Sequence, residues 1–170
     1  EHIATIYSLL NEYVTFPQLN LPGWIGEITS PAEAAKELRN YWGLGDKPID
    51  NIMRTVEQNG IIVTTFATDT DDIDAFSQYI DMNDSDVYII ALSSNKESAA
   101  RINFDIAHEL GHIMLHEWSE DEEVLTREEF KAKEKEANEF AAAFLLPETS
   151  FAKEVSLDPQ KLDYYVQLKR

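Results

Sequence analysis

The sequence contains no cysteine, and this absence limits both its covalent cross-links and its metal chemistry. Disulfides and thiolate ligands are excluded, so a metal site must be built from histidine and carboxylate side chains. Long apolar runs are missing too, and none approaches the ~20 residues that a membrane-spanning helix requires. We therefore expect a cytoplasmic protein that has no membrane partner.

Basic residues are scarce: 14 lysines and arginines are outnumbered by 32 aspartates and glutamates, which gives a net charge of −18. Duplex DNA repels so acidic a surface unless basic residues cluster strongly. The tightest group, Lys131, Lys133 and Lys135, is interleaved with glutamates, so we expect no direct nucleic-acid binding. The acidity favours solubility or, alternatively, a preference for basic segments of a substrate.

At 170 residues, 44% of them hydrophobic, the chain is long enough to bury a core as one domain. We divide it into an N-terminal helical part over 1–60, a core over 61–147 and a C-terminal segment over 148–170. A helix that starts near residue 158 is unfinished at residue 170. We therefore expect the C-terminal segment to be truncated.

Hydrophobic periodicity distinguishes helices from strands along the chain. Apolar and β-branched runs predict strands over 61–66, 73–80 and 87–92. Helical spacing predicts helices over 2–15, 31–42, about 50–60 and 127–145. A further helix is expected to begin at Ser94 and to carry residues 104–114. An α+β fold follows, in which a small sheet of three or more strands packs against helices.

The most informative stretch, AHELGHIMLH, covers residues 107–116 and contains three of the four histidines. Its HExxH motif sets His108 and His112 one turn apart on the same face of a helix, where both imidazoles can reach one Zn²⁺. Glu109 follows the first histidine and is suitably placed to act as a general base. These residues are the minimal machinery of a metallohydrolase. The alternative is a helix whose histidines are only packed or solvated.

A catalytic zinc site needs a third protein ligand, and two candidates follow the motif. His116 continues the histidine series, but it overshoots a metal held by the first two, so we expect a supporting role behind the ligands. Glu134 falls on the apolar stripe of the 127–145 helix, where a carboxylate requires a cation or a proton. Asn138, one turn later, is placed to accept a hydrogen bond from the free ring nitrogen of a ligand histidine.

The carboxylate assignment has an alternative that the sequence leaves open. Glu134 alternatively forms an ordinary surface ion pair with Lys131 or Lys135, which would carry no chemistry. The neighbouring residues Glu136 and Glu139 are expected to point away from the stripe and to be solvated.

Two blocks of the sequence resemble the ImmA/IrrE family of metallopeptidases. They are RINFDIAHELGH at residues 101–112 and EKEANEFAAAFLLP at residues 134–147. The resemblance implies a zincin-like fold of the gluzincin kind for the 61–147 core. Some relatives carry an N-terminal helix-turn-helix domain, which is not visible in this sequence.

By the same resemblance, His108, His112 and Glu134 are the expected ligands of one catalytic Zn²⁺, and Glu109 is the expected general base. Members of the family are bacterial and phage regulators. The resemblance therefore implies cleavage of a transcriptional repressor of the helix-turn-helix type. Such cleavage would derepress phage, mobile-element or stress genes.

These observations predict a zinc endopeptidase. We expect an extended substrate to pair with the strand that precedes the motif helix, through Val87, Tyr88, Ile89 and Ile90. The alternative is a regulatory binding module in which the metal is structural and the repressor is bound without being cleaved. Such a closed site needs a fourth protein ligand, and His116 is the histidine available nearby.

Overall fold

The computed structural model describes residues 2–24, 27, 30–67, 74–81, 86–95, 98–116 and 125–155. In chain order the elements are α1 (His2–Asn11), α2 (Pro31–Tyr41), α3 (Ile52–Gln58), β1 (Ile62–Phe66), β2 (Ala75–Asp81), β3 (Asp86–Ser93), α4 (Ala99–Leu115), α5 (Arg127–Leu145) and α6 (Glu148–Val155). The predicted α+β class is confirmed. The predicted helix near residue 158 lies outside the described residues. Within them, no helix is both long and apolar enough to cross a membrane.

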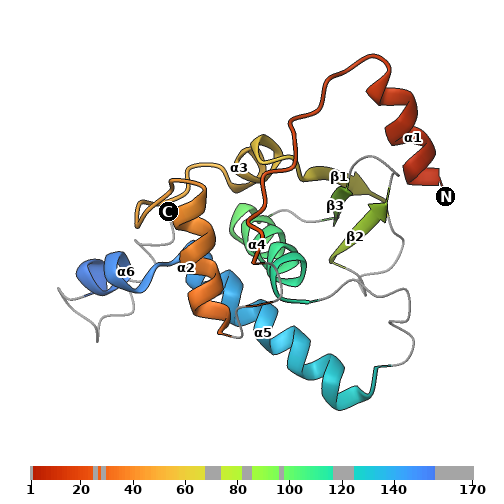
Figure 1. Ribbon diagram of the computed structural model, residues 1–170. Helices are drawn as coiled ribbons and strands as arrows, with labels where there is room; N and C mark the ends of the chain where they lie inside the picture. Colours follow the sequence, from red (N-terminus) through yellow and green to blue (C-terminus); the bar gives the residue numbers. More distant parts are fainter. Residues whose placement is uncertain are drawn as a thin grey trace.

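Strand β3 is the middle strand of a sheet with the order β1–β3–β2 (Figure 1). It runs parallel to β1 and antiparallel to β2, so that Ile89 lies opposite Ile62 on one side and Gln78 on the other. All of its residues after Asp86 are buried, which suits a continuous apolar run covered on both faces. Strands β1 and β2 therefore form the two edges of this sheet.

Helix α4 lies between the sheet and a second layer of helices, because it contacts β2 and β3 as well as α5 and α2 (Figure 1). Its contact with α5 is close at Gly111. A Cβ atom at that position would lie 3.1 Å from the Ala137 carbonyl oxygen and 3.2 Å from the Phe140 Cβ atom. The missing side chain thus lets the two helices approach closely. The buried core around them includes Leu38, Ile90, Ile106, Leu110, Phe140 and Phe144.

The N-termini of the two long helices show how far the local sequence determines where a helix begins. Helix α5 begins with a capping box, in which the Thr126 hydroxyl accepts from the Glu129 amide and the Glu129 carboxylate accepts from the Thr126 amide. Helix α4 begins after Ser98, not after Ser94 as predicted. The reason is that the Ser94 amide donates to the Phe66 carbonyl at 2.9 Å and so still belongs to the end of the sheet.

Arg39 of α2 is buried, with 2% of its surface exposed, and it fastens three parts of the chain together. Its guanidinium donates to the carbonyl oxygen of Gly45 at 2.7 Å and to those of Lys47 and Phe144. The Phe144 carbonyl belongs to the last turn of α5, where helix carbonyls lack intrahelical donors. Arg39 therefore links α2, the following loop and the C-terminal end of α5.

Candidate metal centre

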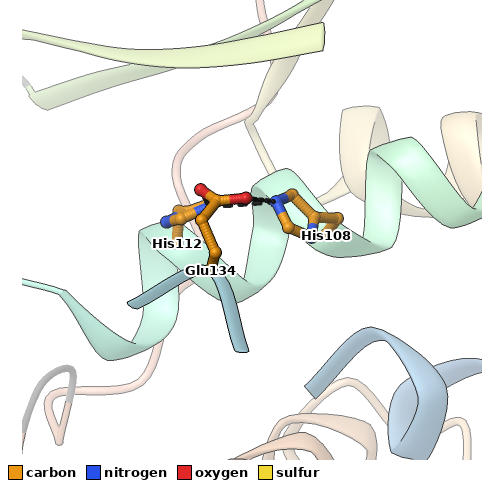
Figure 2. A group of neighbouring side chains, drawn as sticks. All are labelled: His108, His112 and Glu134. Carbon is orange, nitrogen blue, oxygen red and sulfur yellow. Dashed lines mark hydrogen bonds and ion pairs between the residues drawn. The ribbon is translucent and has the colours of Figure 1, made fainter. Parts of the chain in front are cut away.

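Three side chains from two helices converge on one point: His108 and His112 from α4 and Glu134 from α5 (Figure 2). The Nε2 atoms of the histidines are 3.0 Å apart. The Glu134 carboxylate oxygens lie 3.5 Å from His108 Nε2 and 3.2 Å from His112 Nε2. Ligand atoms held at 2.0–2.1 Å around a tetrahedral ion are separated from one another by about 3.3 Å. The observed separations therefore fit a single divalent cation.

The first histidine is oriented by Asn138, which lies one turn after Glu134 on α5. The Asn138 amide nitrogen donates to the Glu134 carbonyl at 2.8 Å, which leaves its Oδ1 atom 3.2 Å from His108 Nδ1. Because Oδ1 can only accept, the proton of a neutral His108 resides on Nδ1. The Nε2 lone pair of His108 is then directed to the point of convergence.

His116 stands behind the second histidine. Its Nδ1 atom lies 3.0 Å from His112 Nδ1, and its Nε2 atom lies 3.1 Å from a carboxylate oxygen of Glu136. The expectation that Glu136 points away is therefore wrong, although its side chain is 47% exposed. Residue 136 lies about 100° around the helix from the buried Ala137, at the flank of the interface, where a long side chain can reach α4.

Burial determines the protonation of these imidazoles. Burial, assisted by repulsion from His108 and His116, lowers the pKa of His112 to about 3. Burial also lowers the pKa of His116, although its hydrogen bond to Glu136 opposes this shift. His112 is consequently neutral at physiological pH and keeps a lone pair for a metal. Two imidazoles and one carboxylate form a donor set typical of Zn²⁺.

Glu109, the residue after His108, is 6% exposed. Its carboxylate accepts a hydrogen bond from the Ser77 hydroxyl of β2 at 2.6 Å. Burial raises the pKa of Glu109, while the hydrogen bond from Ser77 acts in the opposite direction. A carboxylate balanced in this way is suited to accepting and returning a proton.

Ser77 is the site residue that sequence reasoning missed. It lies 32 positions before Glu109, and a single serine within a strand carries no recognisable motif. Only the packing of β2 beside α4 brings the two side chains together.

A groove passes the point where the three ligand atoms converge. One part, of about 270 Å³, is lined by residues that include Phe76, His112 and Lys133. Another part, of about 920 Å³, is lined by residues that include Arg101 and His108. The two parts share Ala75, Glu109, Phe130 and Glu134, so they form one path across the site.

The prediction that a substrate pairs with the strand before the motif helix is wrong for Ile89 and Ile90, whereas Val87 and Tyr88 pair with β2 alone. Within that strand, Ile89 and Ile90 already pair with β1 on one side and with β2 on the other. The residues named for this role were Val87, Tyr88, Ile89 and Ile90. Chain order does not reveal which strand lies at an edge, and here β2 is the edge strand whose Ala75, Phe76 and Ser77 line the groove.

Comparison with known proteins identifies one family. Its sequence model, Peptidase_M78, described as the IrrE N-terminal-like domain, matches residues 56–170. The matched region contains both helices of the site and all three strands, whereas α1 and α2 lie before it. A search of curated proteins found no match to the chain.

Proposed function

Because the chain belongs to the Peptidase_M78 family, the IrrE N-terminal-like domains, we propose that it is a zinc-dependent endopeptidase. The family resemblance of the motif blocks extends the proposal to its substrate, a helix-turn-helix repressor whose cleavage derepresses phage, mobile-element or stress genes. The observation that carries the proposal is the convergence of His108, His112 and Glu134 beside a buried carboxylate, Glu109.

In this proposal His108, His112 and Glu134 hold one Zn²⁺, chosen over harder ions because two of the three donors are imidazole nitrogens. When bound, the ion supplies Lewis acidity that polarises a substrate carbonyl and acidifies water. Asn138 keeps His108 in the required tautomer through its Oδ1 atom. The fourth position of the site remains available for chemistry because no other described residue joins the cluster.

Glu109 moves the proton. Its carboxylate takes a proton from the attacking water, whose oxygen bonds to the carbonyl carbon of the scissile peptide. The same proton passes to the amide nitrogen as the C–N bond breaks, so that Glu109 ends the reaction ionised as it began. Ser77 holds the carboxylate during these transfers.

The substrate is expected to lie in the groove as an extended segment. Strand β2 is an edge strand, and its residues Ala75, Phe76 and Ser77 line the groove beside Glu109. An extended peptide can add to such an edge by main-chain hydrogen bonding. Phe76 and Phe130 are 38% and 55% exposed, so they offer apolar surface to substrate side chains. A flexible segment of a repressor meets these requirements better than a folded surface does.

The alternative of a non-catalytic module with a closed metal site receives no support from the geometry of His116. That role needs His116 as a fourth ligand. Its Nε2 atom instead faces Glu136, and its Nδ1 atom faces the far side of His112. An open metal position favours an enzyme.

The decisive test is the substitution Glu109→Gln, which removes the proton acceptor and leaves the proposed ligands in place. Wild-type and variant chains, both loaded with Zn²⁺, would be added to a lysate of the host cell, and new protein N-termini would be labelled. We expect a new N-terminus within a helix-turn-helix repressor with the wild type alone, and at least 100-fold less product with the variant. Cleavage that survives in the variant, or an absence of cleavage by the wild type with full metal occupancy, would contradict the proposal.

A further inference from the structure

A chain of three side chains extends from the proposed metal site to the surface of α5: His112, His116 and Glu136. We infer that His116 and Glu136 are positioning residues, which hold His112 in the one tautomer that can bind a divalent cation. The inference rests on the proposed metal centre. It assigns to His116 and Glu136 a task that the three ligands and the general base do not include.

The direction of each hydrogen bond follows from the outer end of the chain. The Glu136 carboxylate can only accept, so at 3.1 Å the Nε2 atom of His116 carries the proton. A neutral imidazole has one N–H group, and the Nδ1 atom of His116 is therefore an acceptor. At 3.0 Å from it, the Nδ1 atom of His112 must be the donor.

The consequence appears at the other ring nitrogen of His112. With the proton on Nδ1, the Nε2 atom keeps its lone pair. This is the atom that lies 3.2 Å from Glu134 and 3.0 Å from His108 Nε2. In the opposite tautomer a proton would occupy the place of the cation. Glu136 thus determines, through His116, whether His112 is a competent ligand.

The position of the chain in the fold supports a positioning role. His116 is the C-cap of α4, its side chain is 10% exposed, and its amide donates to the His112 carbonyl at 3.1 Å. Glu136 and Asn138 flank the buried Ala137 on opposite sides of α5. Asn138 sets the tautomer of His108 directly, and Glu136 sets that of His112 through one intermediate. Both ligand imidazoles are therefore oriented from the helix that carries the third ligand.

The same helix supplies a matched control. Glu139 forms an ion pair with Lys135 at 3.6 Å, and both side chains are at least half exposed. Such a pair has little influence on a buried site. Glu139→Ala removes the same group as Glu136→Ala from the same helix, but it does not touch the chain of hydrogen bonds.

The first test measures the dissociation constant for Zn²⁺ by competition with a chromophoric chelator, using the whole chain. We expect Glu136→Ala and His116→Phe to weaken binding by about 10- to 100-fold, as loss of groups that orient ligands does. His116→Asn should restore much of the affinity, because its Oδ1 atom can accept from His112 Nδ1. Glu139→Ala should change it less than about twofold. Equal constants for Glu136→Ala and Glu139→Ala would overturn the inference.

The second test observes the tautomer itself in the metal-free protein, by imidazole ¹⁵N chemical shifts correlated with ring protons. In the wild type we expect His112 to be protonated on Nδ1 and bare on Nε2, and in Glu136→Ala we expect a mixture of tautomers. A wild-type His112 protonated on Nε2 would refute the positioning role. Because this readout needs neither metal nor substrate, it separates failure of the inference from failure of the proposed peptidase function.

Discussion

Hydrogen bonds fix the positions of individual protons in the candidate metal centre. The tautomer of His108 is set by an amide oxygen, and His112 faces a second imidazole. Glu109 accepts a hydrogen bond from a hydroxyl of the neighbouring strand. Asn138 and Ser77 lie 30 and 32 positions from the residues that they hold, whereas His116 is one helical turn from His112. The types of these residues alone do not reveal the hydrogen bonds that orient them.

Ser77→Ala tests the hydrogen bond that holds the Glu109 carboxylate. The substitution removes the 2.6 Å hydrogen bond to the buried carboxylate, so Glu109 loses its fixed orientation. We expect kcat for a peptide spanning the mapped bond to fall about 10-fold, because a misplaced base is a poor acceptor. Zn²⁺ affinity should not change, since the Ser77 hydroxyl donates to Glu109, which is not one of the proposed ligands. Thr64→Ala, on the exposed face of β1, is the control, and a kcat equal to that control would refute the role.

At the scale of elements, the site is the meeting of α4 and α5. Helix α4 alone brings two imidazoles together, as any helix with HExxH does. The third proposed ligand arrives only because α5 can lie close enough to α4. Gly111 is the point at which this approach has no space for a side chain.

Gly111→Ala should therefore affect the metal site by forcing α4 and α5 apart. The added Cβ atom would meet the Ala137 carbonyl oxygen at 3.1 Å, so α5 must shift by a few tenths of an ångström. Metal–ligand distances tolerate about 0.2 Å. We expect Zn²⁺ binding to weaken by about 10-fold, although alanine is the better helix former. Gly23→Ala, where a Cβ atom meets nothing within 4 Å, should bind like the wild type. Unchanged affinity in Gly111→Ala would show that the contact is not critical.

At the scale of the whole molecule, the family match begins at residue 56, yet α2 is part of the same packed core. Leu38 of α2 is fully buried, and α2 packs against both α4 and α5. Arg39 adds a polar connection to the end of α5, and its guanidinium lies 5.7 Å from the centre of the Phe144 ring. Helix α2 thus helps to hold the helix that carries Glu134.

Arg39→Met should reveal the strength of this connection. Methionine keeps much of the apolar bulk but leaves the carbonyls of Gly45, Lys47 and Phe144 without their donor. We expect the free energy of unfolding in urea to fall by about 3 kcal/mol, since unsatisfied buried groups cost about 1–3 kcal/mol each. Arg54→Met, at an exposed position of α3, is the control. A loss no larger than in that control would contradict the proposed linkage.

Much of this molecule was predictable from the sequence because the relevant forces act locally. Helix periodicity, β-branched runs and turn residues located the helices and strands of the described chain except α6, which was not predicted. The HExxH spacing placed two histidines on one helical face, and an apolar stripe drew attention to Glu134 and Asn138. The family resemblance is confirmed by the match over residues 56–170.

Only the tertiary structure decided which strand lies at the edge of the sheet, that Ser77 meets Glu109, and that Glu136 reaches His116. These features arise from contacts between residues that are 20 or more positions apart, such as the 32 between Ser77 and Glu109. Strand order depends on how whole elements pack, and no local period encodes it. The sequence therefore determined which groups are able to perform the chemistry, and the packing decided how each of them is held.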